Sequence, residues 1–153
     1  MYECVIASPV GRLRIAHDDV GLTRVDFTDA ALRPPATPLL QEAARQLEAY
    51  FAGRLTAFDL PLHLQGTPFQ LRCWQALTTI PYGETISYGE QAKRTGSAKA
   101  VRAVGGANHR NPVSIIVPCH RVIGTDGSLT GYGGGLAVKR WLLAHEQEVI
   151  YRK

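Results

Sequence analysis

The stretch NPVSIIVPCHRVIG, residues 111–124, combines a predicted buried strand with a cysteine and a histidine directly after it. Residues 114–117 are apolar and mostly β-branched, which predicts a buried strand. Cys119 and His120 follow at once, and a glycine-rich loop over residues 124–135 comes next. Because the loops that follow buried strands often present reactive groups, we expect the chemistry of the protein to lie here.

A cysteine beside a histidine has two interpretations. A thiol with an ordinary pKa near ~8.5 is mostly protonated at neutral pH, so a nucleophile needs a base or positive charge, which His120 and Arg121 could supply. Most free cysteines are instead small buried apolar side chains, and adjacent side chains of an extended segment point apart. From the residues alone the second interpretation is favoured for Cys119, and it also applies to Cys4 and Cys73.

Upstream of this stretch, residues 1–65 are predicted to form a small lobe. Three short apolar segments separated by turn residues predict an antiparallel meander over residues 2–7, 12–17 and 21–27. A helix should follow, with Thr37 as its cap, Pro38 at its first position and Gly53 at its end. Residues 54–64 alternate only loosely and predict a strand or an extended connection.

Residues 66–153 are predicted to form a second, mainly helical lobe. Thr67 and Gln70 form a capping-box pattern that predicts a helix to about residue 79. A second capping box at Ser87 should open a short helix that Gly96 closes. Ser97 is then expected to cap another helix, and a final helix is expected over residues 136–146.

The two short helices after Ser87 are compatible with a DNA-binding helix-turn-helix, because basic residues surround them. Those residues are Lys93, Arg94, Lys99, Arg102 and Arg110. A plain pair of antiparallel helices with a solvated basic face is equally compatible with the pattern.

The composition limits the size of the protein, its cysteine chemistry and its possible partners. With 153 residues, 45% of them hydrophobic and 20% charged, the chain can fold into one or two compact units. Three widely spaced cysteines predict neither a disulfide framework nor a zinc site, and they favour a reducing compartment. No signal peptide or membrane span is evident, so we expect a cytoplasmic protein. The net charge of +4 suits a polyanionic partner but is common in proteins that bind none.

Residues 111–124 resemble the active-site signature of the methylated-DNA:protein-cysteine methyltransferases, also called O6-alkylguanine-DNA alkyltransferases. Further motifs of this family occur in the same order between residues 66 and 146. They are PYGET at 81–85, SY at 87–88, RAVGGA at 102–107, GY at 131–132 and LLAHE at 142–146. The N-terminal lobe resembles the family only in the SPVG turn at 8–11 and in its general architecture.

This resemblance implies an α+β fold. It consists of an N-terminal lobe with an antiparallel sheet and a helix, and a mainly helical C-terminal lobe with a winged-helix-like helix-turn-helix and an active-site loop. It also implies direct-reversal DNA repair: a methyl or larger alkyl group moves from O6 of guanine, or O4 of thymine, to Cys119. The damaged base is first flipped out of the duplex. Each protein molecule acts once, as a stoichiometric methyltransferase.

The resemblance assigns the catalytic roles. Cys119 is the acceptor, His120 takes the thiol proton through a water molecule, and Glu146 orients and charges the imidazole. Asn111 braces the turn that contains Cys119. Tyr88 donates its hydroxyl proton to N3 of the leaving guanine.

The resemblance also assigns the surfaces that hold the base and the DNA. Five residues are expected around the flipped base: Val122, Tyr132, Gly133, Ser114 and Thr130. Val122 contributes a carbonyl, the backbone near Gly133 an amide, and Thr130 is expected to narrow the pocket. Five others are expected to contact DNA in the minor groove: Arg102, Ala100, Ala103, Gly105 and Arg121. Arg102 is the finger that fills the space left by the flipped base.

No cofactor is implied, because the protein itself accepts the alkyl group. The expected partner is double-stranded DNA with O6-alkylguanine, with no membrane involved and the protein a monomer, nucleoid-associated if its source is prokaryotic. Some relatives bind zinc in the N-terminal lobe, but Cys4 and His17 do not reproduce that ligand set, so we expect no metal. Two other classes of protein are compatible with such a fold. A lesion-binding module would lack the reactive cysteine, and a cysteine hydrolase would turn over repeatedly.

Overall fold

The computed structural model describes residues 1–152. Contacts between residues divide the chain into two compact units. The first unit consists of residues 1–64 together with 112–116, and the second consists of residues 65–111 together with the chain from Val117 on. The division after Leu64 lies beside the predicted lobe boundary, and the structure adds residues 112–116 to the first unit.

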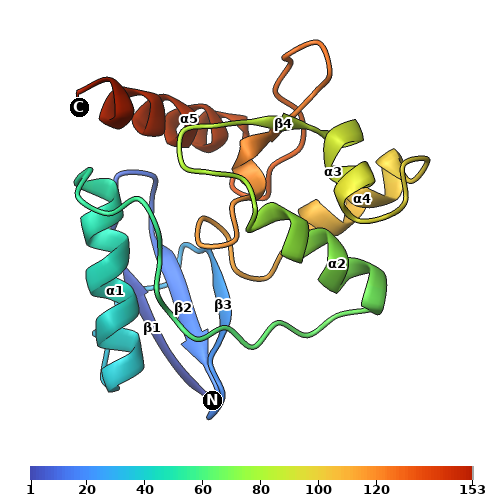
Figure 1. Cartoon of the computed structure of the whole chain (residues 1–153). Helices are drawn as coiled ribbons and strands as arrows, with labels where there is room; N and C mark the ends of the chain where they lie inside the picture. The colour runs from blue at the N-terminus through green and yellow to red at the C-terminus, as the bar shows by residue number, and fades with distance from the viewer. Residues whose placement is uncertain (153) are drawn as a thin grey trace. The chain divides into compact units, whose positions relative to one another are not determined.

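The first unit is built on the predicted meander. Strands β1 (Tyr2–Ile6), β2 (Leu13–His17) and β3 (Leu22–Phe27) form an antiparallel sheet in that order. Helix α1 (Pro38–Phe51) packs against this sheet (Figure 1). Apolar side chains from both layers are completely buried between them, and they include Leu13, Ile15, Val25, Ala43 and Leu47. The predicted meander and helix are therefore confirmed.

Local chemistry determines where α1 begins and ends. The Thr37 hydroxyl accepts a hydrogen bond from the Leu40 amide at 3.2 Å, which satisfies one of the free donors of the first turn. Pro38 fits the first helical position because it has no amide hydrogen to lose. The helix ends at Phe51 with Ala52 as its C-cap, and Gly53 follows with a φ of 77°, a conformation that glycine adopts without strain.

Of two segments for which a strand was predicted or left open, one takes its alternative form and the other is not a strand. Residues 54–64 run as an extended connection that touches the sheet through one isolated bridge, between Leu22 and Leu62. The predicted strand at 114–117 is wrong, because Ile115 adopts a φ of 73° and breaks the extended conformation. Only the neighbouring Val113 bridges to Val25 of β3.

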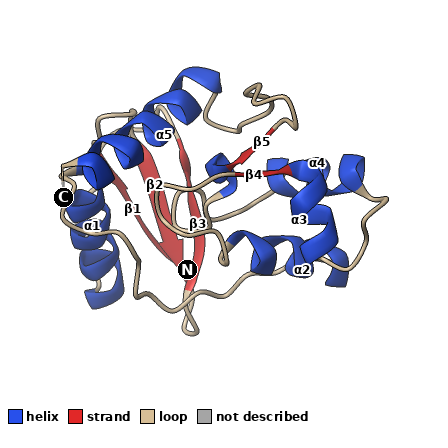
Figure 2. Cartoon of the chain, turned by 45° about the horizontal axis from the view of Figure 1, so that its top comes forward, coloured by secondary structure: helices blue, strands red, loops and turns tan. Residues whose placement is uncertain are grey.

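Up to residue 152, the second unit contains four α-helices: α2 (Pro68–Leu77), α3 (Tyr88–Arg94), α4 (Val101–His109) and α5 (Leu136–Tyr151). A short 3-10 helix, η1 (Cys119–Arg121), follows the Pro118 turn. Strands β4 (Ile86–Ser87) and β5 (Val122–Ile123) pair in parallel, as Figure 2 shows. This pairing, which the sequence did not predict, connects the start of α3 to the chain directly after η1.

Buried polar groups fix the packing of α2, α3 and α4. The Trp74 indole nitrogen donates to the Ala107 carbonyl at 2.9 Å. The Gln91 and Asn108 amides exchange two hydrogen bonds of 2.8 and 2.7 Å. Because buried amides are costly unless they are paired, this reciprocal bond specifies how α3 and α4 lie together. The result is the helix pair predicted for a helix-turn-helix.

The capping predictions were partly correct. Thr67 and Gln70 form the complete capping box of α2. Ser87 accepts from the Glu90 amide at the start of α3. The predicted cap at Ser97 is wrong: α4 begins at Val101, because residues 97–100 form a turn in which the Ser97 carbonyl accepts from the Ala100 amide. Helix α5 runs five residues beyond the predicted end at residue 146, to Tyr151.

Candidate active site

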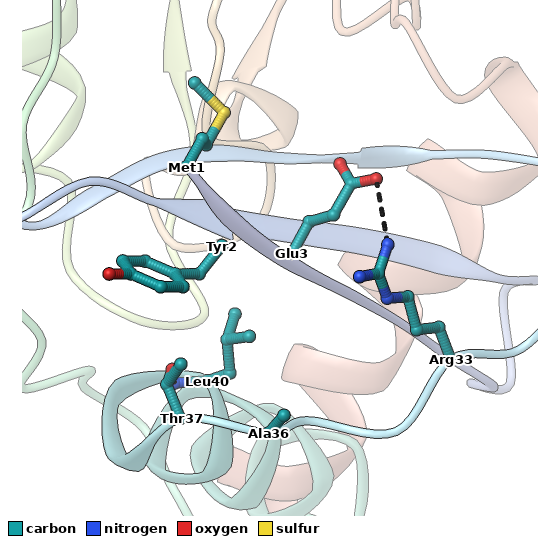
Figure 3. A pocket seen from close by; sticks show the side chains of 7 residues that line it. All are labelled: Met1, Tyr2, Glu3, Arg33, Ala36, Thr37 and Leu40. Atoms are coloured by element: carbon teal, nitrogen blue, oxygen red, sulfur yellow. Dashed lines mark hydrogen bonds and ion pairs between the residues drawn. The ribbon is translucent and has the colours of Figure 1, made fainter.

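A pocket of the first unit lacks the groups of a nucleophilic site. It has a volume of about 280 Å³ and lies between the chain start and the beginning of α1 (Figure 3). It is lined by Met1, Tyr2, Glu3, Arg33, Ala36, Thr37 and Leu40. Its ionic side chains, Glu3 and Arg33, pair with each other at 3.8 Å. This lining offers neither a thiol nor an imidazole.

The second unit holds the predicted nucleophile. Cys119 is the first residue of η1, with 7% of its surface exposed, and its amide donates to the Val117 carbonyl at 2.9 Å. Burial raises the pKa of the thiol, while a hydrogen bond with the Asn111 side chain and the positive charge of Lys139 act to lower it. Burial therefore disfavours the thiolate form of Cys119, and Asn111 and Lys139 favour it.

His120 and Glu146 form a buried pair beside this thiol. The His120 Nε2 atom lies 2.7 Å from Oε2 of Glu146, and the two side chains are 0% and 1% exposed. An ionised carboxylate can only accept hydrogen bonds, so Nε2 carries the proton. The other ring nitrogen, Nδ1, is buried without a partner among residues 1–152. It therefore has the free lone pair that a base requires.

Electrostatics keep this pair in the neutral-histidine form. Burial lowers the pKa of His120, although the bond to Glu146 acts in the opposite direction. Burial alone would raise the pKa of Glu146, but the bonds and charges of His120 and Arg121 outweigh it and hold the pKa well below its ordinary range. At neutral pH the pair is thus an imidazole with a carboxylate.

Glu146 is also held by the turn at residues 81–83. Its Oε1 atom accepts from the Gly83 amide at 3.1 Å. Gly83 has a φ of 80°, and a Cβ atom there would lie 2.9 Å from Ile150 of α5. The positive φ is a conformation that glycine adopts without strain, which explains the glycine of the Pro-Tyr-Gly turn.

The structure corrects the predicted role of Arg121. This residue is 7% exposed, and its guanidinium donates to Glu146 through Nε at 2.9 Å and Nη2 at 3.1 Å. Its Nη1 atom donates to the Ile80 carbonyl at 2.8 Å. All three nitrogens are therefore engaged inside the protein, and Arg121 is the counterion of Glu146 rather than a DNA contact.

Asn111 bonds to the turn that contains Cys119, the turn that the family resemblance implies it braces. Its side-chain nitrogen donates to the Val117 carbonyl at 2.8 Å, and its side chain also bonds to the Cys119 thiol. Tyr132 lies buried with its ring edge-on to the His120 ring, 6.5 Å between centroids. Asn111, which precedes the Cys119–His120 pair in the sequence, and Tyr132, which follows it, thus both contact this pair.

Tyr88, Thr130 and Val122 meet around a buried lysine. The Tyr88 hydroxyl donates to the Thr130 carbonyl at 3.0 Å. The ammonium group of Lys139 donates to the carbonyls of Val122 and Thr130 at 2.7 and 2.9 Å. Lys139 was missed in the sequence, although it lies about two helical turns before Glu146, on the face of α5 that also buries Leu142.

Two predicted pocket residues are not brought to this cluster by any described contact. Gly133 is exposed, and a Cβ atom there would meet nothing within 4 Å. Ser114 belongs to the first unit, where its amide donates to the Val25 carbonyl at 2.9 Å. Their roles stay predictions.

Four of the predicted DNA-binding residues lie in α4 or directly before it, and none of them is buried. Arg102 and Ala103 are exposed, and Ala100 and Gly105 are half-buried. The Arg102 guanidinium makes no hydrogen bond or ion pair within the part of the chain that the structure describes. This side chain is therefore available to a partner, in contrast to Arg121.

Metal ligands are not assembled in the described residues. Across residues 1–152, no three His, Cys, Asp or Glu side chains come together as a potential ligand set. His17 bonds instead to the Asp18 carbonyl and the Thr37 hydroxyl, at 2.8 and 2.7 Å. The same residues contain no helix with the length and apolar character needed to span a bilayer.

Fold and site together define a class of protein. It is a mixed α+β chain in which the buried Cys119 thiol directly precedes the histidine of a buried histidine–carboxylate pair, in the same unit as two short helices with an exposed arginine. Two family models match this chain. The ribonuclease-like domain of 6-O-methylguanine DNA methyltransferase matches residues 1–64, and the DNA binding domain matches residues 68–148.

Individual relatives agree with the family models. The methylated-DNA–protein-cysteine methyltransferase of Methanosarcina acetivorans is 50% identical over 153 residues, covering 95% of this chain and 98% of the relative. The protein of that name from Mycobacterium tuberculosis strain H37Rv is 52% identical over 148 residues, covering 93% and 90%. The crystal structure of M. tuberculosis OGT in complex with DNA superposes with a TM-score of 0.90 at 51% identity, covering 97% and 94%. This chain belongs to the 6-O-methylguanine DNA methyltransferase family.

Proposed function

We propose that this protein repairs alkylated DNA directly, by moving a methyl or larger alkyl group from O6 of guanine to the sulfur of Cys119. The observation that carries this proposal is the buried His120–Glu146 pair beside the thiol, in a chain of this family. M. tuberculosis OGT, which this chain resembles over nearly its whole length, was solved with DNA. Alkylated thymine is a second substrate of the same chemistry.

DNA is bound through α3 and α4. The first of these helices carries basic side chains at its end, and the second presents small residues where a backbone must approach closely. Because O6 of guanine is hidden in the stacked duplex, the damaged nucleotide must be flipped out. The exposed and unpaired Arg102 is the side chain that fills the space it leaves.

The flipped base is recognised by backbone groups and by Tyr88. The carbonyls of Cys119 and Val122 accept from the exocyclic amine, and an amide near Gly133 donates to O6. The Val122 carbonyl already accepts from Lys139, and its second lone pair is available to the base. Tyr88, which donates to the Thr130 carbonyl in the free protein, turns its hydroxyl toward N3 of guanine.

Proton transfer activates the sulfur. The Cys119 thiol gives its proton to Nδ1 of His120 through a water molecule, and Glu146 stabilises the imidazolium that forms. Arg121 keeps the carboxylate ionised and fixed in position while this happens. The histidine is thus a base that is oriented through its opposite nitrogen.

Alkyl transfer then proceeds in line. A sulfur–carbon bond forms as the bond between the alkyl carbon and O6 breaks, and the electron pair of the broken bond goes to the purine. Tyr88 protonates N3, which lessens the charge on the leaving guanine. The product is a thioether with no free thiol, so one protein molecule repairs one base.

This chemistry needs no cofactor, because the acceptor is part of the chain, and one copy of the protein carries the complete site. It also needs a reduced thiol. All three cysteines are free in the structure, which suits the reducing cytoplasm, where the DNA of a prokaryotic cell is found.

Stoichiometry tests the proposal. Increasing amounts of protein are added to a fixed amount of duplex carrying O6-methylguanine in a restriction site, and the restored cleavage is counted. We expect one repaired site for each protein molecule and no further repair with time. Repair that continues beyond this ratio would point to a hydrolase instead.

A further inference from the structure

Lys139 of α5 is a completely buried cation whose position is not explained by packing alone. Its side chain is 0% exposed. The ammonium group donates to two carbonyl oxygens, of Val122 and Thr130, at 2.7 and 2.9 Å. Within residues 1–152 it forms no ion pair with a carboxylate. A buried ammonium without a counterion is costly, so its presence here calls for a function.

The charges around Lys139 come from several elements. Helix α5 contributes Glu146, η1 contributes Cys119, His120 and Arg121, the loop before α5 contributes Tyr132, and α3 contributes Tyr88, whose ring centroid lies 5.9 Å from the Lys139 nitrogen. Glu146 and Arg121 cancel each other in a bidentate ion pair. His120 is neutral, since its Nε2 proton is donated to Glu146. The cluster is therefore left with one uncompensated positive charge, on Lys139.

Cys119 is the group in this cluster that can balance that charge. The Val122 carbonyl that accepts from Lys139 belongs to the residue whose amide donates to the Cys119 carbonyl, so the ammonium is held at the turn that carries the thiol. Burial lowers the pKa of Lys139 and raises that of Cys119, and the charge of each group opposes the effect of burial on the other. Arg121, the cation that η1 contributes, is already neutralised by Glu146 and contributes little to a neighbouring anion. We propose that Lys139 is the counterion of the Cys119 thiolate and so acts as a positioning residue for alkyl transfer. The proposal rests on the proposed function of this site.

This assignment separates two tasks that a nearby histidine alone would have to perform. His120 takes the proton, and Lys139 stabilises the negative charge that stays on sulfur. Burial raises the pKa of the Cys119 thiol, and in a poorly solvated site a single cation opposes that effect strongly. The bonds to Val122 and Thr130 hold the ammonium in place, because both of its acceptors belong to the main chain.

A purely structural role is the competing explanation. In that case Lys139 would only connect the glycine-rich loop to β5, and its charge would have no effect on the thiol. Three substitutions separate the two roles. Lys139→Met removes charge and hydrogen bonds, Lys139→Gln keeps a neutral donor, and Lys139→Arg keeps both. Arg140→Met, at the exposed neighbouring position, is the matched control for the loss of one positive charge.

The experiment is a pH titration of thiolate absorbance in the free protein, with the same variant carrying Cys119→Ser subtracted as background. We expect Lys139→Met and Lys139→Gln to raise the pKa of Cys119 by about one unit or more, a tenfold loss of thiolate at a given pH. Lys139→Arg and Arg140→Met should titrate like the unmodified protein. If Lys139→Met fails to fold, as judged by circular dichroism, the Gln and Arg variants give the same comparison.

An unchanged pKa of Cys119 in a folded Lys139→Gln variant would overturn the proposal and leave the structural role. This titration uses no DNA, so its outcome is independent of the proposed repair activity. If the unmodified protein repairs O6-methylguanine while the pKa of Cys119 is insensitive to Lys139, only the counterion role fails. If the pKa shifts but the unmodified protein repairs nothing, the proposed function fails.

Discussion

His120 and Glu146 lie 2.7 Å apart, nitrogen to carboxylate oxygen, in a part of the second unit that solvent does not reach. This contact determines the direction in which the histidine can act. Nε2 is committed to Glu146, so only Nδ1 can take a proton from Cys119. Arg121 completes the arrangement by holding the same carboxylate through two bonds.

Replacing Glu146 tests this arrangement in two ways. Glu146→Gln removes the negative charge and leaves the buried Arg121 without its counterion, so we expect a loss of about 3–5 kcal/mol in the free energy of unfolding. The transfer rate should fall by about 10²–10⁴-fold, because the imidazolium is no longer stabilised. Urea unfolding and single-turnover kinetics measure the two effects.

The matched control is Glu148→Gln on the same helix. Glu148 is 65% exposed and pairs with Arg152 at the surface, so its loss should change stability by less than about 0.5 kcal/mol. Equal effects of the two substitutions on the transfer rate would show that the contact with His120 has no special role.

Arg102 should matter for duplex DNA and not for the chemistry itself. Its guanidinium is exposed and has no partner in the described part of the chain, and in the proposed mechanism it takes the place of the flipped base. We expect Arg102→Ala to reduce the repair of duplex substrate sharply and to leave reaction with the free alkylguanine base almost unchanged. Arg54→Ala, an exposed arginine of the first unit, serves as the control. Equal losses on both substrates would contradict the finger role.

Tyr88 should affect the rate of transfer more than the binding of DNA. Tyr88→Phe keeps the ring near Lys139 but removes the hydroxyl that donates to the Thr130 carbonyl. Without a proton donor for N3, the rate at saturating DNA should fall by about 10²-fold or more, with little change in affinity. Tyr151→Phe, at a position 82% exposed, should have no effect. Weaker binding at an unchanged maximal rate would assign Tyr88 to DNA contact instead.

A pH-dependent contact stabilises the first unit. The bond to the His63 side chain, 2.6 Å long, and two backbone amides lower the pKa of Asp18 to about 2. A lowered pKa contributes stability above the ordinary value near ~3.9, and this stability is lost as the pH falls toward 2. We expect Asp18→Asn to lower the melting temperature at pH 5, and the difference from the unmodified protein to shrink as the pH is lowered. A difference that does not change with pH would assign the effect to packing.

Much of the fold could be predicted because its signals are local. The helix starts at Thr37 and Thr67 follow from hydroxyl caps with proline next to them, and the meander follows from short apolar segments between turns. The strand predicted at 114–117 failed because the left-handed conformation of Ile115 has no signal in an isoleucine side chain. The pairing of β4 with β5 was missed because each strand has two residues and the partners are far apart in sequence.

The residues at the centre of the site were predicted together with the contact between His120 and Glu146, but two charged residues around them, Arg121 and Lys139, were not placed correctly. Cys119, His120 and Glu146 were identified through resemblance, and the structure brings the histidine and the carboxylate into contact. Arg121 was placed on the DNA because an arginine beside a reactive cysteine gives no sign of being buried. Lys139 was overlooked for the converse reason, since a lysine on a helix is usually a solvated side chain.

The most direct test of the account is to locate the transferred group. The protein is incubated with duplex DNA containing O6-methylguanine, digested, and its cysteine-containing peptides are analysed by mass spectrometry. We predict one methyl group on Cys119 and none on the completely buried Cys4 and Cys73. A protein without a methyl adduct, or with the adduct on Cys4 or Cys73, would contradict the account.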